Sequence, residues 1–312
     1  MALIGRARRM IKVTEALQRA GMMPTVAKAA TAPLEKRIGG RVPALLTGKL
    51  PADVTLEDHT VRGRTGHDIT VRVYRPSGGG MRPGLVYFHG GGWVMGSMLA
   101  CEHICMRIAA DSGVVVASVE YRLAPDDPFP AGLHDCVDAT RWVYDNADDL
   151  GIDQSRFGVG GDSAGGNLAA AVVLADPPPL SAAVLIYPAL DFTRSTPSAR
   201  DYPGPGATAA DLALAGPLYL GECDPADPLC SPLLAEDLSA FPPTLVITAE
   251  YDPLRDEGRL FAERLQEAGV PVRFTNYVQY LHGFFSIPRM YPGVEQAWSE
   301  LTGWVRDALA RK

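Results

Sequence analysis

Short runs of apolar residues alternate along most of the chain with segments in which apolar residues recur at helical spacing. The runs are rich in valine, isoleucine and leucine, a pattern that predicts strands buried on both faces. We expect strands at 84–88, 114–119, 156–160, 182–187, 244–248 and 272–277, with helices among them at about 101–111, 132–146 and 167–175. Alternating buried strands and helices predict an α/β fold, in which helices cover a mostly parallel sheet.

The first strands of this pattern differ from the rest. Residues 54–61 and 69–74 are two strand-like segments separated by turn residues at 63–66. Such a pair predicts an antiparallel hairpin. The sheet is therefore expected to be parallel except where the chain enters it.

Two regions are too long to be simple connections in a compact α/β core. Residues 1–50 hold helical and proline-containing sequence, and residues 192–241 combine a Pro/Gly-rich loop with a helical run at 208–220. We expect both regions to form a cap over the C-terminal edge of the sheet. Residues 51–191 and 242–312 would then make up the two parts of the core.

Bulk composition narrows the class of protein. The 312 residues are enough for one α/β domain with an extensive core. A content of 47% apolar and 21% charged residues is typical of a soluble globular protein. The net charge of −7 disfavours a surface that binds nucleic acid.

The basic residues near the N-terminus resemble an amphipathic helix rather than a signal peptide. No uninterrupted apolar run of about seven residues follows them, and no run in the chain reaches the roughly 18 apolar residues of a membrane span. We expect this segment to pack on the protein's own body, without stable membrane insertion.

The five cysteines form an odd and scattered set. Such a set is not expected to form a disulfide framework and fits a reducing cytoplasm, although Cys223 and Cys230 could approach each other across a loop. In the segment 101–105, Cys101 and Cys105 share a helical face but His103 points elsewhere, so no metal site is expected.

The most informative motif is Gly161-Asp162-Ser163-Ala164-Gly165. It follows a strand-like run and opens an alanine-rich helical run, which is the context of a nucleophile elbow. In such an elbow a sharp turn lifts the serine hydroxyl out of the sheet, and the small residues two positions away let strand and helix approach closely. Ser163 is therefore a candidate nucleophile.

A serine nucleophile needs a base and a carboxylate that orients the base. His282 lies in the loop after the last predicted strand and is the candidate base. The acid has four local candidates: Glu250, Asp252, Asp256 and Glu257. Asp252 is favoured because it precedes a proline in the loop after a strand, whereas Asp256 and Glu257 suit the first turn of the next helix. Glu250 is the alternative.

The segment His89-Gly90-Gly91-Gly92-Trp93 follows the strand at 84–88. Consecutive glycines leave their N–H groups unobstructed and able to converge on one point, as an oxyanion hole requires. The N–H of Ala164 would complete the set from the start of a helix. A phosphate-binding loop is the weaker interpretation, because the segment contains neither a G-x-G-x-x-G motif nor a Walker-type Gly-Lys-Ser/Thr ending.

Together these segments resemble the motifs of a known enzyme family. With Tyr121-Arg122-Leu123-Ala124-Pro125 and residues 252–258 and 282–284, they resemble the bacterial hormone-sensitive-lipase-like esterases of the α/β-hydrolase superfamily, from about residue 50 to the C-terminus. The resemblance implies an α/β-hydrolase fold with a helical cap. It also implies the roles of the residues: Ser163 as nucleophile, His282 as base, Asp252 as acid, and Gly91, Gly92 and Ala164 as oxyanion donors, with Gly90 as an additional donor.

The sequence thus predicts a cytoplasmic carboxylesterase. It would hydrolyse short- to medium-chain acyl esters of small molecules through an acyl-enzyme, without cofactor or metal. An amide or N-acetyl hydrolase would use the same residues, so the sequence does not separate the two. A non-catalytic ligand-binding receptor on this fold would be expected to lack the base, and His282 is present. The oligomeric state stays open, with a homodimer as one option.

Overall fold

The central element is one mixed sheet. The computed structural model describes residues 32, 34–37, 39–202 and 207–310. Within this part of the chain eight strands pair in the order β1-β2-β4-β3-β5-β6-β7-β8. Their bounds are β1 Val54–Arg62, β2 Asp68–Pro76, β3 Arg82–Phe88, β4 Val115–Glu120, β5 Ile152–Asp162, β6 Ala182–Ile186, β7 Thr244–Tyr251 and β8 Val272–Leu281.

The directions of the strands match the sequence pattern. β1 and β2 form the predicted antiparallel hairpin, and β2 is also antiparallel to β4. All further neighbours, from β4 and β3 to β7 and β8, pair in parallel. Because parallel strands end at the same edge of a sheet, the loops after β3, β5, β7 and β8 meet there.

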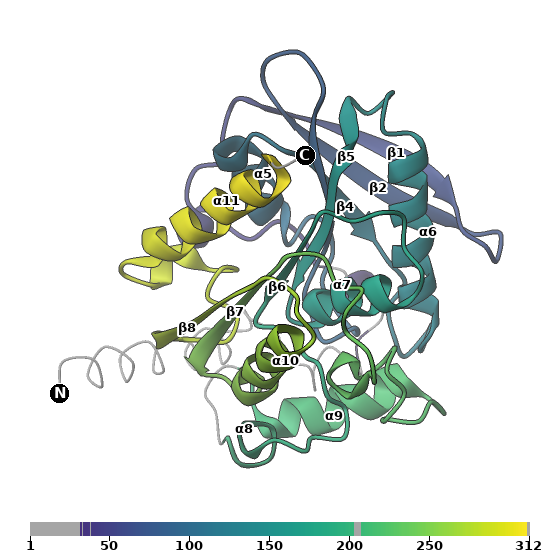
Figure 1. The fold of residues 1–312 in the computed structure, drawn as a ribbon, viewed down its shortest axis with the longest axis vertical. Helices are drawn as coiled ribbons and strands as arrows, with labels where there is room; N and C mark the ends of the chain where they lie inside the picture. The colour runs from purple at the N-terminus through teal and green to yellow at the C-terminus, as the bar shows by residue number, and fades with distance from the viewer. Residues whose placement is uncertain (1–31, 33, 38, 203–206, 311–312) are drawn as a thin grey trace.

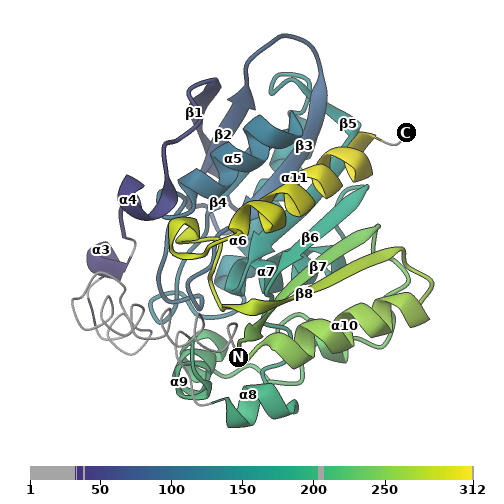
Figure 2. The same cartoon turned by 90° about the vertical axis from the view of Figure 1, so that its left-hand side faces the viewer.

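Helices cover both faces of the sheet (Figures 1 and 2). Helices α5 (Glu102–Ser112) and α11 (Val294–Ala310) lie on one face. The other face carries α6 (Ala131–Asp145), α7 (Ala164–Leu174) and α10 (Arg255–Glu267). None of the described helices is long and apolar enough to cross a bilayer. The architecture is the predicted α/β-hydrolase fold.

Strand β3 shows how this sheet is stabilised. Val86 and Phe88 belong to the core beneath α6, α7 and α10, whereas Leu85 and Tyr87 belong to the core beneath α5 and α11. All four side chains are at most 1% exposed. Burial of a Val, Leu or Phe side chain contributes about 1.5–3 kcal/mol, so a strand that is apolar on both faces is stable only between two helical layers.

The N-terminal region is described only in part. The segment predicted to be an amphipathic helix lies outside the described residues, and the first described helices are α3 (Leu34–Arg37) and α4 (Ala44–Thr47). The buried guanidinium of Arg37 donates to the carbonyl oxygens of Val94 and Ala124, and its own carbonyl accepts from the N–H of Gly96. This end of the N-terminal region therefore holds the loop that follows β3.

Residues 192–241 leave the sheet between β6 and β7. They contain α8 (Pro197–Asp201), α9 (Ala209–Leu220) and the short 3₁₀ helix η1 (Pro232–Leu234), and α8 and α9 lie together at one end of the sheet (Figure 2). Thr208 and Asp211 form a capping box that fixes the start of α9. A second 3₁₀ helix, η2 (Pro288–Met290), precedes α11.

Candidate active site

Ser163 occupies the turn between β5 and α7. Its backbone has φ 57° and ψ −119°, in the left-handed half of the map that is costly for any residue but glycine. A Cβ on Gly161 would collide with the carbonyl oxygen of Gly165, and one on Gly165 would collide with that of Phe88. The two glycines therefore allow the tight crossing of strand and helix that holds Ser163 in this conformation.

His282 and Asp252 continue from the serine in one line. The Oγ of Ser163 lies 2.8 Å from Nε2 of His282, and Nδ1 of the same ring lies 2.7 Å from Oδ2 of Asp252. A neutral imidazole with its proton on Nδ1 donates to Asp252 and leaves Nε2 free to accept from the hydroxyl. The other oxygen, Oδ1 of Asp252, accepts from the N–H of Leu254, which fixes the carboxylate.

Electrostatics favour a basic imidazole. Burial by itself lowers the pKa of His282, but the charge and hydrogen bond of Asp252 and the charge of Asp162 outweigh it and raise the pKa above its ordinary value. The ring edge of Tyr187 packs at 4.8 Å between centroids and restricts the orientation of the imidazole. The histidine is thus both held in place and tuned toward accepting a proton.

The remaining acid candidates have other partners. Glu250 accepts from Arg255 and Asn276, and Asp256 accepts from Arg255 and from the N–H of Ser198 on α8. Glu257 accepts from the N–H of Leu190 in the loop after β6, and burial raises its pKa well above the ordinary value. Of the four carboxylates near the end of β7, only Asp252 contacts His282 in the described structure.

The glycine loop (residues 89–93) lies beside the elbow. Gly91 and Gly92 have φ of 137° and 61°, and a Cβ on Gly91 would collide with the carbonyl oxygen of Met95. Among the described residues their N–H groups have no protein acceptor, and the N–H of Ala164 is the first of α7, which has no partner within the helix. These three donors are available to a ligand.

Gly90 is bound differently. Its N–H donates to Oδ1 of Asp162, which also accepts from the hydroxyl of Tyr87. Burial raises the pKa of Asp162 to about 6, an effect that these hydrogen bonds reduce. No role for Asp162 was predicted from the sequence, in which its position directly before the candidate nucleophile is the only signal.

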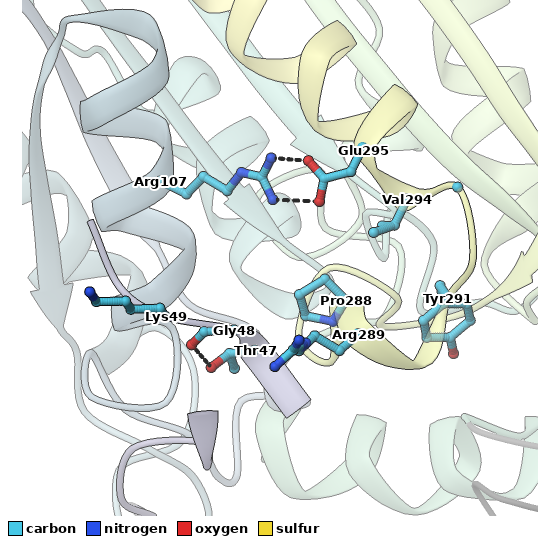
Figure 3. A pocket seen from close by; sticks show the side chains of 10 residues that line it. Thr47, Gly48, Lys49, Arg107, Pro288, Arg289, Tyr291, Val294 and Glu295 are labelled. Atoms are coloured by element: carbon cyan, nitrogen blue, oxygen red, sulfur yellow. Dashed lines mark hydrogen bonds and ion pairs between the residues drawn. The ribbon is translucent and has the colours of Figure 1, made fainter. Parts of the chain in front are cut away.

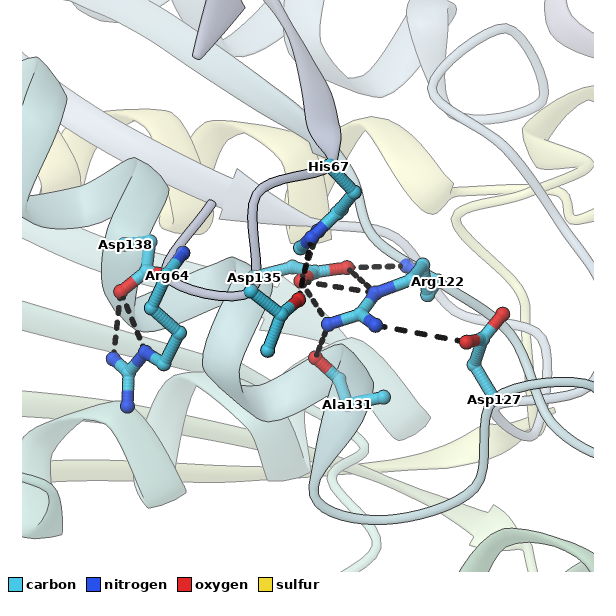
Figure 4. A network of polar contacts seen from close by, with 8 residues as sticks. Arg64, His67, Arg122, Asp127, Ala131, Asp135 and Asp138 are labelled. Atoms are coloured by element: carbon cyan, nitrogen blue, oxygen red, sulfur yellow. Dashed lines mark hydrogen bonds and ion pairs between the residues drawn. The ribbon is translucent and has the colours of Figure 1, made fainter. Parts of the chain in front are cut away.

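Residues 121–125 pack against the glycine loop and hold it in place. Tyr121 stacks on His89 at 4.3 Å between ring centroids, and its hydroxyl donates to the carbonyl oxygen of His89. The next residue, Arg122, binds the buried carboxylate of Asp135 on α6 through its side chain and its N–H, and His67 contacts the same carboxylate (Figure 4). This network fixes the segment on which the loop rests.

A cavity of about 200 Å³ lies next to the glycine loop, beneath α9. Its apolar wall includes Trp93, which stacks on Tyr219 of α9 at 4.7 Å and contacts Phe192 at 4.8 Å between ring centroids. The other lining residues are Ala189, Asp191, Arg194, Leu212, Ala213, Gly216, Pro217, Leu220, Pro225, Leu254 and Glu257. Trp93 therefore connects the glycine loop directly to a mostly apolar chamber under residues 192–241.

A larger hollow of about 460 Å³ lies elsewhere, between α4 and the start of α11 (Figure 3). Lys49, Arg107 and Arg289 line it, and Arg107 is paired with Glu295. None of the three residues in the serine–histidine–aspartate line contributes to the wall of either hollow, but the smaller cavity contacts the glycine loop through Trp93 and the larger one does not. It is a basic surface hollow separate from the site above.

The cysteine segment at α5 is packed in the core. Cys101 and Cys105 lie 3.8 Å apart at Sγ and both are buried. His103 instead bonds through Nε2 to the carbonyl oxygen of Phe285. The described residues contain no group of three or more potential metal-binding side chains.

Comparison with protein families adds an independent finding. A family model described as the alpha/beta hydrolase fold matches residues 85–286. The carboxylic ester hydrolase LipN of Mycobacterium tuberculosis is 39% identical over 277 residues, covering 84% of this chain and 72% of LipN. An ethyl acetate hydrolase of Pseudomonas putida is 38% identical over 265 residues, covering 81% of this chain and 82% of that protein.

Solved structures are similar over nearly the whole chain. An ester hydrolase from the metagenome of Lake Arreo, complexed with a bipyridine phosphonate derivative, has a TM-score of 0.86 and 34% identity over 98% of this chain and 99% of its own. A hyperthermophilic esterase from Pyrobaculum calidifontis has a TM-score of 0.78 and 38% identity, covering 100% of this chain and 93% of its own.

Proposed function

Because this chain belongs to the α/β-hydrolase family, in its hormone-sensitive-lipase-like group, we propose that Ser163, His282 and Asp252 form its catalytic triad. The chain is a carboxylic ester hydrolase. The observation that carries the assignment of the triad is the continuous hydrogen-bonded line from the Oγ of Ser163 through the ring of His282 to Asp252, with distances of 2.8 and 2.7 Å.

The proposed reaction begins at the serine. Nε2 of His282 takes the hydroxyl proton while Oγ attacks the ester carbonyl carbon, and the positive imidazolium is stabilised by Asp252. We assign the N–H groups of Gly91, Gly92 and Ala164 to binding the negative oxygen of the tetrahedral intermediate. The N–H of Gly90 holds Asp162 instead, so we assign it to fixing the loop.

Collapse of the intermediate expels the alcohol and leaves an acyl-enzyme. His282 passes the proton to the departing alkoxide, and then removes a proton from the water that attacks the acyl group. The same N–H groups bind the second oxyanion. Removal of one such donor typically costs about 10²–10³ in kcat, so this loop should supply a substantial part of the catalysis.

We propose that the substrates are esters with short to medium acyl chains. The cavity beside Trp93 supports this proposal, since its volume of about 200 Å³ and its mostly apolar wall suit a few methylene groups rather than a long chain. The relative from Pseudomonas putida is named an ethyl acetate hydrolase, which agrees with a small acyl group. Residues 1–50 and 192–241 are the proposed cap over this chamber.

The decisive experiment is a panel of nitrophenyl esters from acetate to palmitate, run beside matching nitroanilides. Our proposal expects the highest kcat/KM at short to medium chains and much slower anilide hydrolysis. A clear preference for anilides would instead identify an amide hydrolase, and a maximum at palmitate would contradict the chain-length assignment. Substitutions of Ser163 and Asp252 test the catalytic assignment separately.

We also propose a cytoplasmic location. The odd, scattered cysteines support it, and all five are free thiols in the structure. Fractionation of cells that express the full chain tests the proposal; recovery of the activity outside the cytoplasmic fraction would contradict it.

A further inference from the structure

Cys223 and Cys230 lie side by side just after α9. Their Sγ atoms are 3.3 Å apart, although seven positions separate the two residues in the chain. Cys223 is partly exposed, whereas Cys230 is buried. Neither residue belongs to the proposed catalytic machinery.

The turn between the two cysteines keeps their sulfur atoms close. The N–H of Asp227 donates to the carbonyl oxygen of Asp224, and the N–H of Cys230 donates to that of Asp227. A disulfide requires a sulfur–sulfur distance of about 2.05 Å, so the sulfurs need to approach by only about 1 Å more. The turn thus holds the two sulfur atoms near bonding distance.

We propose that Cys223 and Cys230 are a site of reversible disulfide formation, for which a low-molecular-weight disulfide such as oxidised glutathione is the oxidant. The thiolate of Cys223 attacks one sulfur of the oxidant and releases one thiolate. The thiolate of Cys230 then attacks Sγ of Cys223 and releases the second. Two cysteine thiols are oxidised to one disulfide, and the oxidant is reduced to two thiols that take up the two protons.

The other cysteines of the chain provide an internal comparison. Cys101 and Cys105 are also close, at 3.8 Å between Sγ atoms, but they are 4% and 0% exposed. Cys136 is likewise buried. Attack on an external disulfide requires access to solvent, so oxidation should select Cys223 first.

The crosslink would act on the wall of the substrate chamber. The carbonyl oxygen of Cys230 accepts from the side chain of Asn167 on α7, four residues after Ser163. Ser231 links the same loop to the chamber, because its hydroxyl donates to the carbonyl oxygen of Pro225 and accepts from the N–H of Phe192. Closing the ring 223–230 should therefore stabilise this wall against unfolding.

The test uses the intact protein. Burial raises the pKa of both thiols, so the reduced enzyme is incubated with oxidised glutathione at about pH 8.5 and then denatured in acid and alkylated. Trypsin leaves both cysteines, and no other cysteine, in residues 201–255. We expect this peptide to lose two hydrogen atoms and to take up no alkylating reagent until dithiothreitol is added.

Cleavage before aspartate then locates the bond. Asp224 and Asp227 lie between the cysteines, so the two halves should stay joined only through sulfur. Separate peptides that both carry the alkylating group, a glutathione adduct on Cys223 alone, or a crosslink at Cys101 and Cys105 would each overturn the proposal.

A stability measurement provides the second readout. We expect the oxidised wild type to have a Tm higher than the reduced protein by on the order of a few °C. Cys223→Ser should lose this difference, and Cys136→Ser, the matched control, should keep it. An equal Tm for oxidised and reduced wild type would contradict the proposed effect on the chamber wall.

Discussion

The carboxylate of Asp162 accepts a hydrogen bond from the N–H of Gly90 at 3.1 Å, which ties the residue before the nucleophile to the start of the glycine loop. The same carboxylate raises the pKa of His282 through its charge. One buried side chain therefore affects both the position of the proposed oxyanion donors and the basicity of the proposed catalytic histidine.

Asp162→Asn separates these two effects. The amide oxygen can still accept from Gly90 and Tyr87, but the negative charge is lost, so the pKa of His282 should fall. The rise of kcat/KM with pH should shift to lower pH, with most of the activity retained at the plateau. A shift to higher pH would contradict this account.

Asp162→Ala leaves the donors of Gly90 and Tyr87 buried without an acceptor. The free energy of unfolding should fall by about 1–3 kcal/mol for each of these two groups.

The wild-type pH profile follows from the raised pKa of His282. Only neutral imidazole can take the proton of Ser163, and its ordinary pKa is about 6.5. Because the pKa is raised, the protonated, inactive form persists to higher pH, and kcat/KM should rise with a midpoint above about 6.5. Initial rates with nitrophenyl butyrate across this range test the prediction.

Chelators should leave the pH profile unchanged. A loss of activity in EDTA that zinc restores would contradict the mechanism.

Ser163→Ala should reduce kcat by on the order of 10⁴ or more, since it removes the atom that carries the acyl group. The fold should persist, because the substitution deletes one partly exposed hydroxyl. Burst kinetics and circular dichroism measure the two parts of this prediction. A variant that retains about a tenth of the wild-type turnover would exclude Ser163 as the nucleophile.

Matched amide substitutions test the choice of acid. Asp252→Asn should greatly reduce kcat, because an amide stabilises the wrong tautomer of His282. Asp256→Asn and Glu250→Gln should have much smaller effects on kcat, since these side chains contact Arg255 and elements outside the triad. If either control lost more activity than Asp252→Asn, the acid would have to be reassigned.

The sequence predicted β3, β4, β6 and β7 well because these strands are apolar on both faces, a pattern that depends only on local composition. The hairpin and the parallel strands from β3 to β8 lie where expected, although β5 and β8 extend further than their apolar centres. The C-terminal helix α11 was not predicted. Its apolar residues pack in one core with those of α5, and this contact between distant parts of the chain is not visible in the local sequence.

The site was predictable to the level of motifs and no further. Spacing and chain order indicated Ser163, Asp252 and His282, because short motifs at strand ends have few possible placements. The functions of Asp162 and Tyr187 depend on contacts across the sheet, which no local pattern encodes. The approach of Cys223 and Cys230 across a loop, by contrast, was one of the possibilities that the sequence indicated, and their Sγ atoms lie 3.3 Å apart.

Arg37 connects the N-terminal region to the loop that follows β3. Arg37 is 4% exposed and donates to the carbonyl oxygens of Val94 and Ala124. Val94 follows Trp93 in the chain, and the N–H of Ala124 donates to the carbonyl oxygen of Trp93. Arg37→Ala leaves the carbonyls of Val94 and Ala124 without their charged donor, so the glycine loop should lose order. Deletion of residues 1–40 should have at least this effect and should also change the selectivity between acetate and octanoate esters.

The two variants distinguish the roles of this region. If it acts as a cap, Arg37→Ala should lower kcat with little change in selectivity, whereas the deletion should change KM and the octanoate-to-acetate ratio as well. The deleted protein should also aggregate more readily, because apolar surface becomes exposed. Unaltered kcat, selectivity and solubility after deletion would show that residues 1–40 neither cover the chamber nor position the loop.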